Sequence, residues 1–329
     1  MPKIRYNNID NVSVDKTFKE FRQWREERRR KVKDLSFVVP SVPPMLSYLG
    51  ENRLDTTITW IGHSTFFIQY EGMNIITDPI WAGRLGLEKR LVPPGMVIGD
   101  VPPVDLILIS HSHYDHMHVS SIRKLYRAET TVVVPAGLKR KMLRKGFRNC
   151  VEMQWWESLD VGGIKLSFVP TQHWTRRTPF DTNTSHWGGF IMEPAKPERH
   201  PNAGGKGGEG GHKLPPNLYF AGDSGYFPGF KEIGRRFKVH VTMMPIGAYE
   251  PEWFMTSQHV NPEEAVQAFL DVGAETMIPM HYGTFRLADD TAREALDRME
   301  AARKEQGLTE ERIRTLGNGE TLIIHPEAR

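Results

Sequence analysis

The sequence contains almost no cysteine: its 329 residues include one, Cys150. A single cysteine excludes an intrachain disulfide, and it cannot supply the several thiolates of a cysteine-rich zinc cluster. Any metal ion that the chain binds must therefore be held by histidine and carboxylate side chains.

Long apolar runs and internal repeats are also absent. No uncharged apolar run approaches the ~18 residues that cross a bilayer, and the opening residues, MPKIRYNNID, lack the apolar core of a signal peptide. We therefore expect a cytoplasmic protein that does not span the membrane, with a peripheral position at the membrane as an alternative. The absence of repeats at solenoid or propeller spacing excludes those architectures.

The composition is that of an ordinary globular protein, with 39% apolar and 25% charged residues. The chain is long enough to bury the core of one large domain or two small ones. Its formal net charge of +3 fits attraction to phosphate-bearing ligands but does not single out nucleic acid. We expect no nucleic-acid partner.

Positive charge concentrates in residues 16–33, KTFKEFRQWREERRRKVK, a segment that is predicted to be helical. Its aromatic residues Phe18, Phe21 and Trp24 follow a spacing of three, which is close to the helical period. Two interpretations stay open: the aromatic stripe packs on the core, or the helix rests on anionic lipid headgroups.

The chain divides into two parts, the second of which contains an insertion of distinct composition. Residues 1–55 are expected to form a basic, partly helical extension that packs on a main domain of residues 56–329. Within this domain, residues 195–216, AKPERHPNAGGKGGEGGHKLPP, are too rich in glycine and polar residues to fold on their own. We expect them to form a flexible surface insertion.

Apolar runs separated by turn residues predict strands and helices in mixed order. The runs TTITWIG, TFFIQY and MNIITD, between residues 56 and 78, are typical of an antiparallel meander. Helical patterns follow among further short strands, at residues 118–127, 137–146, 262–272 and 291–305. This order favours an α/β sandwich.

The most informative segment is DLILISHSHYDHMH, residues 105–118, in which an apolar strand ends directly before histidines and an aspartate. His111 and His113 are two apart in extended chain, so their side chains project to the same side and can hold one ion. Asp115 and His116 lie where the backbone turns into the next helix, and they can face a second ion. Imidazole and carboxylate ligands without thiolate favour Zn²⁺, with Fe or Mn as alternatives.

Three more candidate ligands follow apolar strands: His173 after KLSFVPTQ, Asp223 after NLYFAG and His281 after ETMIPM. If Asp223 bridges both ions, each ion receives four protein ligands and shares an open position for water. The first ligand set is then His111, His113, His173 and Asp223, and the second is Asp115, His116, Asp223 and His281. The sequence thus predicts a centre of two Zn²⁺ ions per chain.

With these residues the sequence resembles the metallo-β-lactamase superfamily, and within it the phospholipases D that hydrolyse N-acylphosphatidylethanolamine, together with their bacterial relatives. The motifs that carry the resemblance span most of residues 56–290. They are WIGHST (60–65), SHSHYDHM (110–117), QHW (172–174), AGDSGY (221–226), IGAYEPEWFM (246–255), QHVNPEEAV (258–266) and MHYGTF (280–285). The resemblance implies a four-layer αβ/βα sandwich of the α/β class and a dinuclear zinc site.

The resemblance also implies an activity, the hydrolysis of a phosphodiester by hydroxide that the metal activates. An N-acylphosphatidylethanolamine would yield an N-acylethanolamine and phosphatidic acid. The implied partners are a phospholipid or another phosphodiester as substrate and a second copy of the chain in a homodimer. The residues implied in catalysis are Asp115, Asp223 and His259. Those implied in substrate binding are Tyr114, Arg176, Gln258 and His259.

Two other functions fit parts of the same pattern. A lactonase or another ester hydrolase of the superfamily would use the same metal ligands; a groove open to an apolar surface would favour the lipid, and a closed polar pocket the lactone. A non-catalytic metal-binding module at a membrane surface is the third interpretation, and the presence of the complete ligand set argues against it. His63 in WIGHST belongs to neither ligand set, so we expect it to support a ligand or the fold.

Overall fold

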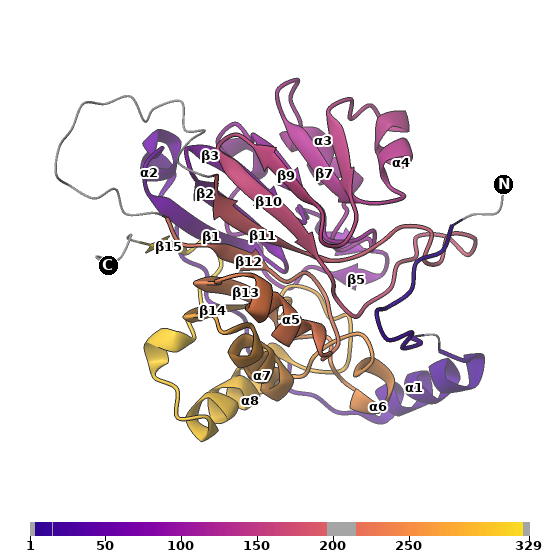
Figure 1. Ribbon diagram of the computed structural model, residues 1–329. Helices are drawn as coiled ribbons and strands as arrows, with labels where there is room; N and C mark the ends of the chain where they lie inside the picture. The colour runs from indigo at the N-terminus through magenta and orange to yellow at the C-terminus, as the bar shows by residue number, and fades with distance from the viewer. Residues whose placement is uncertain (1–3, 15, 196–214, 325–329) are drawn as a thin grey trace, which may run out of the picture.

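Two mixed β-sheets form the centre of the protein (Figure 1). The computed structural model describes residues 4–14, 16–195 and 215–324. Most of the glycine-rich insertion predicted at 195–216 lies outside the described residues.

The first sheet has seven strands in the order β15-β1-β2-β3-β6-β7-β8. The strands β15, β1, β2 and β3 pair antiparallel, which confirms the predicted meander, and the pairs from β3 to β8 are parallel. Its strands are β1 (Thr56–Gly62), β2 (Thr65–Tyr70), β3 (Met73–Thr77), β6 (Leu106–Leu108), β7 (Thr131–Pro135), β8 (Cys150–Met153) and β15 (Thr321–Ile324).

The second sheet has six strands in the order β14-β13-β12-β11-β10-β9. The strands β12, β13 and β14 are parallel, and the pairs from β12 to β9 are antiparallel. A separate hairpin of β4 (Arg84–Leu85) and β5 (Glu88–Lys89) lies outside both sheets. The strands of the second sheet are β9 (Ser158–Val161), β10 (Ile164–Val169), β11 (Gly189–Pro194), β12 (Leu218–Phe220), β13 (Val241–Pro245) and β14 (Thr276–Met280).

Alternating side chains of the first sheet enter two different hydrophobic cores. In β2, Phe66 and Ile68 point into the core between the sheets, whereas Phe67 points into the outer core, because successive side chains of a strand face opposite sides. Three helices cover that outer face: α2 (Leu46–Glu51), α3 (Val119–Leu125) and α4 (Lys139–Arg144).

Helices also cover the outer face of the second sheet. Phe230, Phe269 and Met299 come from three different helices and belong to the same core as the strands. These helices are α5 (Gly229–Arg236), α7 (Pro262–Val272) and α8 (Ala292–Glu305). Two short 3₁₀ turns are η1 (Ile98–Asp100) and η3 (Glu310–Arg312). The layers therefore run helix, sheet, sheet, helix, which confirms the predicted four-layer αβ/βα sandwich.

The basic segment forms helix α1 (Phe18–Arg30), which begins with a capping box between Thr17 and Glu20. The Trp24 ring stacks on Phe254 of the short helix α6 (Glu252–Met255) with the ring centroids 5.2 Å apart. Phe18 is 83% exposed and Phe21 is 43% exposed, so only part of the predicted aromatic stripe packs on the domain. Within the described residues, no helix is long and apolar enough to cross a bilayer.

The two sheets approach closely where Gly222, after β12, meets Ser110, after β6. Gly222 has a φ of +64°, and a Cβ atom added there would lie 2.8 Å from Ser110 Cβ and 2.9 Å from the Gly188 carbonyl oxygen. Gly273, which ends α7 with a φ of +71°, provides a matched comparison because no atom lies within 4 Å of its added Cβ.

We expect Gly222→Ala to lower the free energy of unfolding by more than Gly273→Ala does. Both alanines must adopt a left-handed backbone, which costs about 1–2 kcal/mol. Only the alanine at 222 also presses against Ser110, where overpacking adds roughly 1–3 kcal/mol. Urea unfolding of both variants measures the difference, and equal losses would contradict the close approach at Gly222.

Candidate metal centre

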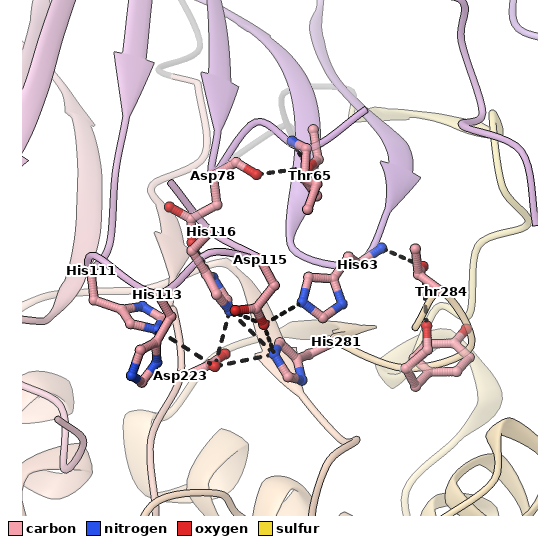
Figure 2. A network of polar contacts seen from close by, with 12 residues as sticks. His63, Thr65, Asp78, His111, His113, Asp115, His116, Asp223, His281 and Thr284 are labelled. Atoms are coloured by element: carbon pink, nitrogen blue, oxygen red, sulfur yellow. Dashed lines mark hydrogen bonds and ion pairs between the residues drawn. The ribbon is translucent and has the colours of Figure 1, made fainter. Parts of the chain in front are cut away.

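The candidate ligands lie where strands end, as the sequence predicts. His111 to His116 follow β6, and three further side chains follow strands of the second sheet: His173 after β10, Asp223 after β12 and His281 after β14. Because β10, β12 and β14 run in the same direction, their carboxyl ends lie at one edge of that sheet. Figure 2 shows His111, His116 and His281 surrounding the Asp223 carboxylate.

Asp223 lies at the centre of the cluster. Its Oδ2 atom is 3.0 Å from His116 Nε2 and 3.1 Å from His281 Nε2. The same oxygen is 3.9 Å from His111 Nε2 and 4.0 Å from His173 Nε2. The other oxygen, Oδ1, is buried and has no hydrogen-bond partner among the described residues. A carboxylate in this position can contact two ions at once.

The remaining ligand atoms gather on two sides of Asp223. On one side, His113 Nδ1 lies 2.9 Å from His111 Nε2 and 3.2 Å from His173 Nε2. On the other, Asp115 Oδ2 lies 3.2 Å from His116 Nε2 and 3.5 Å from His281 Nε2. The structure therefore brings the seven predicted ligands together, with His111, His113 and His173 on one side of Asp223 and Asp115, His116 and His281 on the other.

The second ring nitrogen of three histidines is hydrogen-bonded away from the centre. His111 Nδ1 contacts Ser110 Oγ at 2.9 Å, and His173 Nδ1 donates to the Gln258 carbonyl oxygen at 2.9 Å. His116 Nδ1 donates to Asp78 Oδ2 at 2.7 Å. Such contacts fix the imidazole orientation and leave Nε2 for a metal ion.

Asp78 and His63 support the ligands from outside the predicted sets. Asp78, which sequence analysis missed, lies directly after β3 and accepts hydrogen bonds from the backbone and the hydroxyl of Ser110. His63 Nε2 lies 2.9 Å from Asp115 Oδ2, so His63 supports a ligand.

His63, Asp78 and His281 all have positive φ angles, of 57°, 34° and 64°. Backbone strain of this kind persists where surrounding contacts hold it, commonly at functional sites.

Burial determines the protonation state of three predicted ligands, His111, His113 and His173. Burial lowers the pKa of His113 to about 3 and of His173 to about 4, and it holds the pKa of His111 well below its ordinary value. These imidazoles are therefore neutral at pH 7, which is the form that binds a metal.

The carboxyl groups of the predicted ligands Asp115 and Asp223 are ionised despite their burial. Burial raises the pKa of Asp223, but the neighbouring His116 and His281 outweigh this effect and hold the pKa well below its ordinary value. Conversely, burial lowers the pKa of His281, but Asp223 and Asp115 outweigh burial and raise it to about 9. A divalent ion beside these carboxylates would displace that proton. The neutral imidazoles, ionised carboxylates and unpartnered Asp223 Oδ1 fit a pair of divalent ions, and the donor atoms suit zinc, with iron or manganese as alternatives.

The predicted substrate-binding residues lie at different depths. His259 Nδ1 is 4.0 Å from Asp223 Oδ2 and buried. The Gln258 Nε2 atom lies 3.2 Å from Met255 Sδ, and the Gln258 backbone carbonyl oxygen contacts His173.

Tyr114 and Arg176 line a surface cavity of about 660 Å³ that opens beside His113 and Asp115, here termed the mouth cavity. Tyr114 is 53% exposed, and its ring packs 3.9 Å from the guanidinium of Arg177. Arg177, which no sequence pattern predicted as a site residue, donates to the Ser112 and Met117 carbonyl oxygens and thereby holds the ligand loop. The remaining lining residues are Leu85, Gly86, Trp174, Thr178, Pro179 and Leu287.

Comparison with known proteins identifies the family. A family model described as a Beta-lactamase superfamily domain matches residues 73–282. An uncharacterized protein of Mycobacterium tuberculosis (strain ATCC 25618 / H37Rv) is 32% identical over 283 residues, which cover 82% of this chain and 70% of that protein. The N-acyl-phosphatidylethanolamine-hydrolyzing phospholipase D 1 of Caenorhabditis elegans is 33% identical over 245 residues, which cover 69% of this chain and 64% of that protein.

Solved structures share the fold. Igni18, a metallo hydrolase from the hyperthermophilic archaeon Ignicoccus hospitalis KIN4/I, matches with a TM-score of 0.59 at 22% identity over 83% of this chain and 99% of that chain. At this identity the likeness shows the fold alone. The family match and the sequence identity to the relatives show that this chain belongs to the metallo-β-lactamase superfamily.

Proposed function

We propose that the chain is a zinc-dependent phosphodiesterase that cleaves N-acylphosphatidylethanolamine in the manner of a phospholipase D. The observation that carries this proposal is the mouth cavity, which places positive charge and apolar side chains beside the candidate metal centre. The relative from Caenorhabditis elegans supports the same substrate class. The products would be an N-acylethanolamine and phosphatidic acid.

The lining of the mouth cavity suits a phosphodiester joined to acyl chains. Leu85, Pro179 and Leu287 supply apolar walls, whereas Arg176 and Arg177 supply positive charge. The volume of about 660 Å³ lies in the range of cavities that hold medium-sized ligands. A phospholipid needs both kinds of wall, which favours the lipid over a small polar lactone.

Bound divalent ions would lower the pKa of water and stabilise negative charge on the phosphoryl oxygens. The acids of the chain would hold the ions. Asp223 would contact both ions, and Asp115 would contact one of them while His63 orients its carboxylate. This support fixes the ligands before substrate binds, so little reorganisation accompanies the reaction.

His259 and Arg176 would act on the substrate. His259 Nδ1 is buried without a hydrogen-bond partner in the described part of the chain, so it is free to contact a phosphoryl oxygen. Burial lowers the pKa of His259 well below its ordinary value, and the imidazole is therefore neutral. Arg176 lies at the mouth cavity, where its guanidinium would pair with the phosphodiester.

Asp223→Ala should remove most of the bound zinc and abolish phosphodiester hydrolysis, because it deletes the carboxylate between the two ligand sets. Elemental analysis of freshly purified wild type is expected to find two zinc ions per chain. Mass spectrometry should identify N-acylethanolamine and phosphatidic acid as products of N-acylphosphatidylethanolamine in mixed micelles.

Two results would contradict parts of this proposal. Unchelated wild type without bound metal would exclude the metal centre. Zinc-bound protein that opens a lactone but leaves N-acylphosphatidylethanolamine intact would exclude the phospholipase activity and favour the lactonase.

His259→Ala should lower kcat by about 10²-fold, the effect of removing one hydrogen bond that stabilises developing charge. The zinc content should stay unchanged, because the seven predicted ligands remain. His259→Asn, which keeps a donor near the same place, should recover part of the loss. A variant that loses zinc instead would make His259 a metal ligand and not a substrate contact.

Arg176→Gln should raise KM for the phosphodiester about tenfold, since it removes one charge-assisted contact at the mouth cavity. Arg148→Gln provides the control, because Arg148 is exposed and lies outside that cavity. Steady-state kinetics on mixed micelles measures both variants. Equal KM values for the two variants would show that Arg176 does not contact the substrate.

A further inference from the structure

A second cationic feature lies outside the metal centre, between helix α1 and the loop that carries His281. Five cationic side chains line a groove of about 330 Å³, here termed the cationic groove. They are Arg25, Arg28, Arg29, Lys31 and Arg286. The groove therefore joins the N-terminal helix to a loop that also borders the metal centre.

Two acids of the domain, one buried and one partly exposed, pair with two of these cations. Asp289, whose side chain is fully buried, lies 3.5 Å from Arg28 Nε and 3.2 Å from Lys31 Nζ. Glu250 lies 3.6 Å from Lys31 Nζ. Because these acids sit on the domain, they fix the end of α1 and keep its cations at the groove.

The other three cations meet no acid within the described ranges. Arg25 and Arg29 have no ion pair there, and the Arg286 Nε atom is buried without a hydrogen-bond partner. The helix dipole favours Arg29 in the last turn of α1, but it does not account for Arg25, which lies further from that end, or for Arg286 on the loop. Several guanidinium groups that face one groove repel each other unless an anion lies between them.

A mainly apolar cavity adjoins the cationic groove, and Arg286 lines both. Its lining also includes the predicted ligand His281 and the polar residues Asp290 and Thr291. This cavity holds about 90 Å³ and is bordered by Leu35, Val38 and Leu91. Their side chains are 49%, 55% and 51% exposed, so apolar surface continues outward from the cavity. Positive charge thus lies directly beside apolar surface, which is the arrangement that an anionic amphiphile requires.

We propose that the cationic groove binds the phosphate of an anionic lipid, with the first part of its acyl chain against the neighbouring apolar cavity. Guanidinium groups match phosphate oxygens in paired, charge-assisted hydrogen bonds, and a phosphate monoester carries close to two negative charges at neutral pH. The choice of a lipid over free phosphate rests on the apolar cavity and on the proposed function. The bound phosphate would contact both α1 and the loop of residues 281–290 and would thereby hold them together.

The test is binding of dioctanoyl phosphatidic acid to the zinc-loaded full chain by isothermal titration calorimetry. The double variant Arg25→Gln/Arg29→Gln should weaken binding about tenfold or more, because two contacts to the phosphate are lost. Lys19→Gln/Arg22→Gln is the matched control, since it removes the same charge from α1 at positions outside the groove. Arg286→Gln should also weaken binding, although this substitution lies on the loop and leaves the sequence of α1 unaltered.

Further measurements distinguish binding at the groove from binding at the metal centre. They also distinguish binding of the lipid from binding of free phosphate. Binding that persists in Asp223→Ala but is lost in Arg25→Gln/Arg29→Gln belongs to the groove, whether or not the enzyme hydrolyses phosphodiesters. Equal losses in the groove variant and the matched control would overturn the proposal. Inorganic phosphate that binds as tightly as the short-chain lipid would overturn the lipid assignment, and weaker binding of phosphate would support it.

Discussion

The buried carboxylate of Asp223 is the constraint on which the rest of the structure depends. A charged carboxylate removed from water costs several kcal/mol unless opposite charge or hydrogen bonds compensate it. Here one oxygen lies within 4.0 Å of imidazole nitrogens from both sheets, and the other has no hydrogen-bond partner in the described part of the chain. Compensation therefore requires that the edges of the two sheets converge, which explains the contact of Gly222 with Ser110.

The ligands of the centre are stabilised by a layer of contacts that comes from distant parts of the chain. Asp78 follows β3, yet it orients His116 after β6, and His63 follows β1, yet it contacts Asp115. The His281 backbone N–H donates to the His63 carbonyl oxygen, which ties the end of the second sheet to the start of the first. The ligands come from the ends of strands in both sheets, and the His63–His281 bond joins the two sets, so neither half of the sandwich would form the centre alone.

The sequence predicted those features that a local pattern determines. The strands β1 and β2 have the predicted bounds, and the histidine cluster after β6 follows from its spacing. Strand β15 was missed because it is defined by its pairing with β1, more than 250 residues away in the chain. Asp78 and Arg177 were missed for the same reason, since only the fold brings them to the ligand loop. Asp78 does carry one local sign, its position directly after the apolar run MNIIT, whereas no local pattern marks Arg177.

The N-terminal extension is connected to the metal centre by a continuous path of contacts. Trp24 of α1 stacks on Phe254 in α6, and the Met255 carbonyl oxygen accepts hydrogen bonds from the next turn, at Gln258 and His259 (Figure 1). Gln258 in turn accepts from His173. The cationic groove forms on the same helix, so these contacts connect the groove to the predicted ligand His173.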